Sequence, residues 1–195
     1  MTARTEPVVG SDVFPRIRGT TVVPSGQNEK FIHLEPLAEG ISDAQPDYYN
    51  GSRPAELHPN LRNVGPDDVG RNDLPGYIIP TNYTSRPILP NHFTELKGPD
   101  GKASVMKRQI TYDLAVGARG MHKLQSYGQD GYAYDGNAYT FGSTYHSGTG
   151  TLQMYTMHPT EPAQPGGNPQ YHTTQVRGFA MSGRPLPWRL TCNAD

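Results

Sequence analysis

The most regular pattern of apolar positions in the chain begins at residue 103. Apolar or small residues recur there every three or four positions, at Met106, Ile110, Leu114, Gly117, Met121 and Leu124. This spacing predicts one face of an amphipathic helix. Gly117 and Gly120 each cost such a helix about 1 kcal/mol relative to alanine. That cost indicates close packing on a sheet, and Gly128 marks the expected end of the helix.

Alternating apolar and polar residues predict four strands around this helix. Residues 88–97 precede it, and residues 137–146, 150–158 and 171–181 follow it. Residues 147–149 are short enough to join the second and third of these strands as a hairpin. A short helix is an alternative for residues 171–181.

The first 75 residues are rich in Pro, Gly, Asp and Asn, and they predict mostly turns and loops. Two short strands are expected within them, at residues 19–23 and 30–34. A Pro-led aromatic segment follows at residues 45–51, then a polar loop at 52–73 and an apolar segment at 76–80. The predicted fold is α/β (α+β), with a central mixed sheet flanked by one long helix.

The 195 residues suit one domain with a small core, because only 34% of them are apolar. Nineteen prolines and 22 glycines indicate long irregular connections. We expect an irregular N-terminal region at residues 1–40, the main domain at 41–183 and a tail at 184–195.

A net charge of -1 provides no global attraction to nucleic acid or to an anionic membrane, so any such binding needs a local patch. The single cysteine, Cys192, suits a reducing compartment. No apolar run approaches the roughly 20 residues that span a bilayer, and the N-terminus does not read as a secretory signal. We therefore expect an intracellular protein of the cytoplasm or nucleus with no membrane partner.

Glu95 and Lys97 lie two residues apart on the strand predicted at residues 88–97, so they project to the same face while Leu96 points to the core. A carboxylate can hold a hard divalent cation, and an adjacent ammonium can position a water or balance charge on a phosphate. The pair alone is weak evidence, because exposed strands often carry opposite charges at this spacing.

The surrounding sequence adds a resemblance to a known superfamily. The matching segments are residues 89–103, Lys107-Arg108-Gln109, residues 117–122 and 124–125, then 145–146, 154–159, 165–171 and 174–175. Over about residues 40–183 the chain resembles an uncharacterised family of fungal proteins assigned to the PD-(D/E)xK nuclease-like superfamily. The order strand, strand with Glu-x-Lys, long helix, strand is that of the superfamily core, and a Pro-Asp pair lies upstream at Pro46-Asp47.

This resemblance implies a restriction-endonuclease-like core and magnesium- or manganese-dependent hydrolysis of nucleic acid. Asp47 and Glu95 would be the metal ligands, Lys97 the catalytic lysine and Gln109 a positioning residue. Asp73 is a rival for the acidic position, because the spacing of 48 residues from Asp47 to Glu95 exceeds the usual gap. The tail lacks the terminal helix expected of such a domain, which indicates a truncated or alternatively spliced chain.

Basic residues exceed acidic ones by six to three between residues 95 and 123. Such an excess suits a surface that contacts phosphates, and a solvated helix face is the alternative. The residues assigned to nucleic-acid binding are Lys102, Lys107, Arg108 and Arg119. Two further functional classes remain open: a nuclease-like binding module that has lost cleavage, and an interaction protein with no site.

Other catalytic or metal-binding patterns are weaker. His146, His158 and His172 fall on successive predicted strands without the short spacing of a zinc motif, so structural or surface roles are favoured for them. The region near Ser143 has no nucleophile elbow, and Cys192 lies in the tail.

Overall fold

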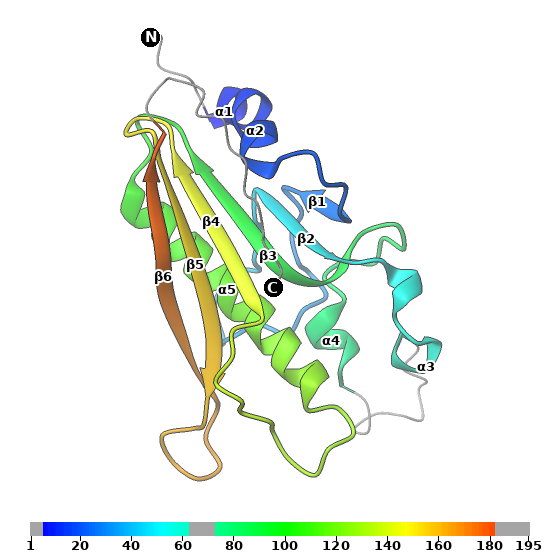
Figure 1. The fold of residues 1–195 in the computed structure, drawn as a ribbon. Coiled ribbons are helices and arrows are strands. Elements are labelled where there is room, and N and C mark those ends of the chain that lie inside the picture. Colours follow the sequence, from blue (N-terminus) through cyan, green and yellow to red (C-terminus); the bar gives the residue numbers. More distant parts are fainter. Residues whose placement is uncertain (1–5, 63–72, 182–195) are drawn as a thin grey trace, which may run out of the picture.

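The structure is a computed structural model and describes residues 6–62 and 73–181. Its centre is a mixed sheet of six strands in the order β1-β2-β3-β4-β5-β6, with the long helix α5 lying along one face (Figure 1). The strands are β1 (Ser25–Gln27), β2 (Tyr48–Ser52), β3 (Ile88–Lys97), β4 (Thr140–His146), β5 (Thr151–Thr160) and β6 (Gln170–Ala180). The helices are α1 (Glu6–Asp12), α2 (Phe14–Arg18), the 3-10 helix η1 (Pro54–Glu56), α3 (Pro59–Arg62), α4 (Pro75–Ile78) and α5 (Ala103–Gln125).

One parallel pair of strands organises the sheet. β3 and β4 are parallel, and every other neighbouring pair is antiparallel. Two parallel neighbours need a crossover connection, which α5 and the loop after it provide. The mixed sheet and the long helix of the sequence prediction are therefore confirmed.

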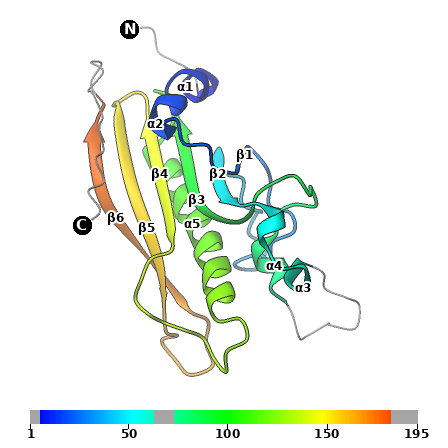
Figure 2. The same ribbon diagram turned by 45° about the vertical axis from the view of Figure 1, so that its right-hand side comes forward.

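Close packing between α5 and the sheet is also confirmed. A methyl group added at Gly117 would lie 2.6 Å from the Phe93 ring and 2.8 Å from the Pro90 carbonyl oxygen of β3. On the sheet side, Gly142 of β4 leaves room for the side chains of Ile110 and Leu114. The glycines thus let α5 pack closely on β3 and β4; Figure 2 shows the helix lying beside these strands.

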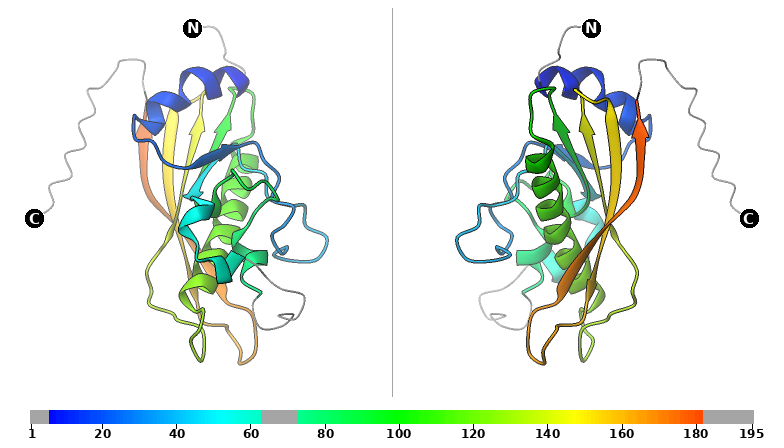
Figure 3. Two further views of the ribbon diagram at one scale, coloured as in Figure 1. Left: turned by 90° about the vertical axis from the view of Figure 1, so that its right-hand side faces the viewer. Right: turned by 90° about the vertical axis from the view of Figure 1, so that its left-hand side faces the viewer.

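The opposite face of the sheet is covered at one end by the two N-terminal helices (Figure 3). Leu96 of β3 and Tyr145 of β4 pack there against Val9 and Phe14. Phe14 also stacks on Tyr48, with 3.6 Å between the ring centroids. Because helices cover both faces at this point, the end of β3 that carries Glu95 and Lys97 lies between two layers.

The strands predicted around the helix are confirmed as β3, β4, β5 and β6, and the hairpin between β4 and β5 is confirmed with them. Two N-terminal strand predictions are wrong. Residues 19–23 precede the observed β1, and residues 30–34 form turns. The amides of Phe31 and His33 donate to the carbonyl oxygens of Ala44 and Pro80, which belong to two different loops and provide no continuous partner strand.

Three further differences concern short helices. The sequence predicted neither α1 nor α2, and the apolar segment at residues 76–80 lies mainly in the helix α4. Pro75 occupies the first turn of α4, where its fixed φ favours a helix start. Part of the predicted 52–73 loop and the tail after residue 181 lie outside the described residues. Within residues 6–62 and 73–181, no helix combines the length and apolar character needed to cross a bilayer.

Candidate active site

Asp47, the residue before β2, forms hydrogen bonds with two adjacent residues of β3, Glu95 and Leu96. The Asp47 backbone amide donates to Oε1 of Glu95 at 3.2 Å, and the Leu96 backbone amide donates to Oδ2 of Asp47 at 2.7 Å. The register explains this arrangement, because Tyr48 pairs with Thr94 and the next residues along each strand are Asp47 and Glu95. The antiparallel ladder thus brings together two carboxylates that are 48 residues apart.

Glu95 and Lys97 lie on the face of β3 that α5 covers, together with Phe93. The Glu95 side chain is completely buried and Lys97 is 9% exposed. Leu96 points to the other face and packs in the second apolar cluster. The predicted division of these three side chains between the two faces is therefore confirmed. The sequence did not indicate that the Glu95 and Lys97 side chains would both be buried.

A third carboxylate, Asp113 of α5, faces this pair and was not a candidate from sequence. Its side chain is 2% exposed, and it interacts directly with the Glu95 carboxyl. One signal for it existed, because Asp113 adjoins Leu114 on the apolar stripe of the predicted helix. An acidic residue within a buried face is rare unless it is paired or functional.

Burial dominates the electrostatics of the two innermost carboxyls. It raises the pKa of Glu95 to about 9, and the negative charges of Asp113 and Asp47 contribute to the same rise, whereas the hydrogen bond from the Asp47 amide and the charge of Lys97 oppose it. Burial also raises the pKa of Asp113 to about 7; a hydrogen bond with the Glu95 carboxyl opposes that rise. Two adjacent carboxyls in a low-dielectric environment titrate as a pair, so at neutral pH they retain a proton.

Four buried oxygens on Glu95, Asp113, Gln109 and Thr144 receive no hydrogen bond from a fixed donor. Two of them, Oε2 of Glu95 and Oδ2 of Asp113, belong to the carboxyls that share a hydrogen bond, whereas Oε1 of Gln109 and Oγ1 of Thr144 have no partner in the described part of the chain. Thr144 is the neighbour of Glu95 on β4, and Gln109 lies one turn before Asp113 on α5. Buried polar atoms are nearly always hydrogen-bonded, so the protonated carboxyl pair accounts for the first two atoms and the last two suit a water or another polar group. In the described part of the chain, no group of three or more His, Cys, Asp or Glu side chains has a spacing that holds a metal ion.

Asp73, the rival to Asp47, belongs to a different part of the molecule. Its Oδ2 atom lies 3.0 Å from Nζ of Lys123, near the C-terminal end of α5. Lys123 also lies over the Tyr77 ring, 4.4 Å from its centroid. Because the Asp47 amide is hydrogen-bonded to the Glu95 carboxyl, Asp47 rather than Asp73 is the acidic residue that lies next to Glu95.

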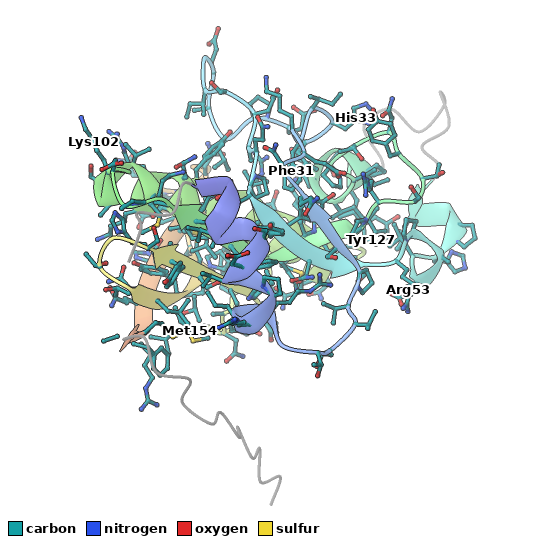
Figure 4. All side chains as sticks on the ribbon, turned by 90° about the horizontal axis from the view of Figure 1, so that it is seen from above. Phe31, His33, Arg53, Lys102, Tyr127 and Met154 are labelled. Carbon is teal, nitrogen blue, oxygen red and sulfur yellow. The ribbon has the colours of Figure 1, made fainter. Side chains whose placement is uncertain are left out.

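The four basic residues assigned to nucleic-acid binding fall into two groups. Lys102, Lys107 and Arg108 are exposed in and just before the first turns of α5, and Figure 4 shows Lys102 projecting from this end. Arg119 instead donates hydrogen bonds to the backbone carbonyl oxygens of Glu35 and Pro36. It thereby holds the loop before β2 against α5.

The three histidines considered as metal ligands occupy two distant places. His146 lies beside Lys97 at the end of β4, and its Nε2 atom is 2.8 Å from the Gly101 carbonyl oxygen. His158 and His172 face each other across β5 and β6 as stacked rings 5.6 Å apart. Their positions fit the structural and surface roles favoured from sequence.

No protein-family model, curated protein or solved structure matches the chain in comparisons with known proteins. The site is thus characterised by its own geometry. It consists of Asp47, Glu95, Lys97 and Asp113, contributed by the segment before β2, by β3 and by α5.

Proposed function

We propose that the chain is a divalent-cation-dependent phosphodiesterase that acts on nucleic acid, with a PD-(D/E)xK type of site. The observation that carries the proposal is a pair of hydrogen bonds between Asp47 and β3. The Asp47 backbone amide donates to the Glu95 carboxyl, and the Leu96 backbone amide donates to the Asp47 carboxylate. This pair places two carboxylates beside Lys97 at the end of a central strand. Cation-assisted hydrolysis of a phosphodiester uses this combination of charges.

The order of the elements supports the same proposal. β2 and β3 form an antiparallel pair that carries the acidic residues, α5 follows, and β4 returns parallel to β3. The resemblance noted in the sequence implies this order of strand, strand, helix and strand. We therefore assign a restriction-endonuclease-like core to β2, β3, α5 and β4.

Carboxylate oxygens are the type of donor that a hard divalent cation such as Mg²⁺ or Mn²⁺ prefers. The Glu95 carboxyl is buried and hydrogen-bonded to that of Asp113, so a cation at Glu95 would have to displace the proton that this pair retains. Asp47 is partly exposed and supplies the second carboxylate from the solvent side. When bound, the cation polarises the phosphate and lowers the pKa of a coordinated water.

The remaining residues bind and orient the substrate. Lys97 provides a positive charge beside Glu95, where it can balance the charge that develops on the phosphate oxygens. Gln109 is half-buried on the same face of α5 as Asp113 and can hydrogen-bond a group in the site. Lys102, Lys107 and Arg108 contact the phosphate backbone outside it.

The first test is nicking of supercoiled plasmid in Mg²⁺ or Mn²⁺. The Lys97→Ala variant should lower the nicking rate by at least about 100-fold, because it removes a charge that stabilises the transition state. Chelation with EDTA should abolish nicking. Lys30→Ala is the matched control, because Lys30 is an exposed lysine that pairs with Asp43 rather than with the carboxylates of the site.

Thermal melting must show that Lys97→Ala remains folded at the assay temperature. Equal nicking by the wild type and by folded Lys97→Ala would contradict the proposal, since it would identify a contaminating nuclease. Loss of nicking in Lys30→Ala would also count against a specific role for Lys97.

A second candidate is a nuclease-like module that binds nucleic acid without cleaving it. The complete burial of Glu95 favours this alternative, because a substrate phosphate must approach through Asp47 and Lys97. Both candidates use the same exposed basic residues at the start of α5. They differ only in the nicking result.

Both candidates predict salt-dependent binding. The dissociation constant for a short DNA duplex or single strand should rise steeply with salt concentration, because each neutralised phosphate releases counterions. The double variant Lys107→Ala, Arg108→Ala should reduce the slope of log K against log salt by about 2. Fluorescence anisotropy at several salt concentrations measures this. Unchanged slopes, or the absence of binding at low salt, would show that these residues do not form a nucleic-acid-binding surface.

A further inference from the structure

We propose that two copies of the chain associate through their β6 edges, which pair antiparallel and join the two sheets into one. β6 is the last strand in the sheet order, and within residues 6–62 and 73–181 its only neighbouring strand is β5. Figure 2 shows β6 at the outer edge of the sheet. An edge strand presents a row of unpaired backbone N–H and C=O groups, which can bond to the edge of a second chain.

β6 has few of the features that protect a sheet edge from such pairing. Protected edges are short, or they carry charges, prolines or bulges. β6 has 11 residues without a proline or an acidic residue, and Arg177 is its only lysine or arginine. All of its residues except Tyr171 and Phe179 are exposed. A bulge at Val176 interrupts the ladder with β5, so the regular segment that is open to pairing is residues 170–175.

The backbone groups on the open side of this segment follow from the ladder with β5. The Met181 amide donates to the carbonyl oxygen of Gly150, the residue before β5. An antiparallel strand bonds to a given neighbour through every second residue, so the even-numbered residues of β5 bond to β6. The partners of its odd-numbered residues include Tyr171, Thr173 and Gln175. Their N–H and C=O groups therefore point away from β5, to the open edge.

The side chains of this segment are complementary to those of a second copy. A twofold axis at Thr173 creates three kinds of contact: Thr173 with its own counterpart, His172 with Thr174, and Tyr171 with Gln175. Thr–Thr pairs are favourable across antiparallel strands, and no like charges lie opposite each other in this register. Both chains then use the same surface, as the twofold symmetry of a dimer requires. This complementarity favours a second copy over an unrelated peptide as the partner.

The test is sedimentation equilibrium of the full chain at protein concentrations up to about 1 mM, where the wild type should form a dimer. Thr173→Lys and Thr173→Glu should each raise the dimer dissociation constant about fivefold or more, because like charges then face each other across the axis. An equal mixture of the two variants should restore dimerisation, because a lysine then faces a glutamate. Thr84→Lys, at an exposed position in the turn before β3, is the matched control and should dimerise as the wild type does.

Hydrogen exchange of the wild type tests the same contact without a substitution. The amides of Tyr171, Thr173 and Gln175 should exchange more slowly as the protein concentration rises and the dimer forms. Exchange of these amides that does not change with concentration would contradict edge pairing.

Three results of the sedimentation experiment would overturn the inference. The first is a wild type that stays monomeric at about 1 mM. The second is a dimer that tolerates both Thr173 variants, since it must use another surface. The third is a mixture that associates no better than the separate variants, since the axis then does not pass through Thr173. The proposed function is tested separately, because this pairing does not involve Asp47, Glu95 or Lys97.

Discussion

In the absence of a divalent cation, the free energy of unfolding should fall as the pH rises from about 7 to about 9. The folded chain retains a proton on the Glu95 and Asp113 carboxyls over this range, because burial raises both pKa values. The unfolded chain has released these protons by about pH 5. Since the folded state binds more protons, the free energy of unfolding decreases by about 1.4 kcal/mol per pH unit for each retained proton.

The histidines and tyrosines with shifted pKa values contribute little to the pH dependence of the free energy of unfolding between about pH 7 and pH 9. Desolvation lowers the pKa values of His92 and His122, so these side chains destabilise the fold only as the pH falls below about 6.5. Burial raises the pKa values of Tyr48 and Tyr112, which therefore lose their protons above about pH 10. The slope between about pH 7 and pH 9 thus reports mainly on the two carboxyls.

Urea unfolding in EDTA at pH 7, 8 and 9 measures this effect. Glu95→Gln should flatten the slope and should be more stable than the wild type at about pH 9, because its amide needs no proton to remain neutral. Its side-chain oxygen can still accept the hydrogen bond from the Asp47 amide. The exposed Glu39→Gln serves as the control and should keep the wild-type slope. A slope shared by the wild type and Glu95→Gln would show that the carboxyl pair does not control the pH dependence.

The second large effect is expected at Gly117. Gly117→Ala should lower the free energy of unfolding by about 1 to 3 kcal/mol, because the new methyl group meets the Phe93 ring and the Pro90 carbonyl oxygen. The Pro90 atom belongs to the backbone of β3 and cannot turn aside as a flexible side chain can. The loss should exceed the gain of about 1 kcal/mol that alanine brings to a helix interior.

This substitution has a second expected consequence at the site. Gly117 lies one turn after Asp113 on the same face of α5, so moving the helix away from β3 also moves Asp113 away from Glu95. The pH slope of Gly117→Ala should therefore be flatter than that of the wild type. Urea unfolding at the same three pH values measures both effects together.

Gly131→Ala is the control for Gly117→Ala. No atom lies within 4 Å of the methyl group that it adds, and Gly131 is exposed after the end of α5. Its effect should stay within about 0.5 kcal/mol. A destabilisation at Gly131 equal to that at Gly117 would exclude close helix packing as the cause.

The elements with a strong local period were predictable from sequence. The boundaries of β3 were predicted at residues 88–97 and observed there, and the stripe from Met106 to Gly117 lies on the buried face of α5, whereas Met121 and Leu124 are half-buried. Both follow from the alternation of side chains along a strand and from the helical repeat. The N-terminal helices and β1 were not predictable in this way, because they are too short to establish a period.

The candidate site likewise has features that follow from local sequence and features that depend on tertiary contacts. The sequence by itself determined that Glu95 and Lys97 share one face of a strand, because that depends only on residues two positions apart. Only the tertiary structure placed Asp47 beside Glu95 and Asp73 beside Lys123, brought Asp113 against Glu95 and directed Arg119 to backbone carbonyl groups. These contacts join residues that are far apart in the chain, and they depend on strand register and on how closely α5 approaches the sheet.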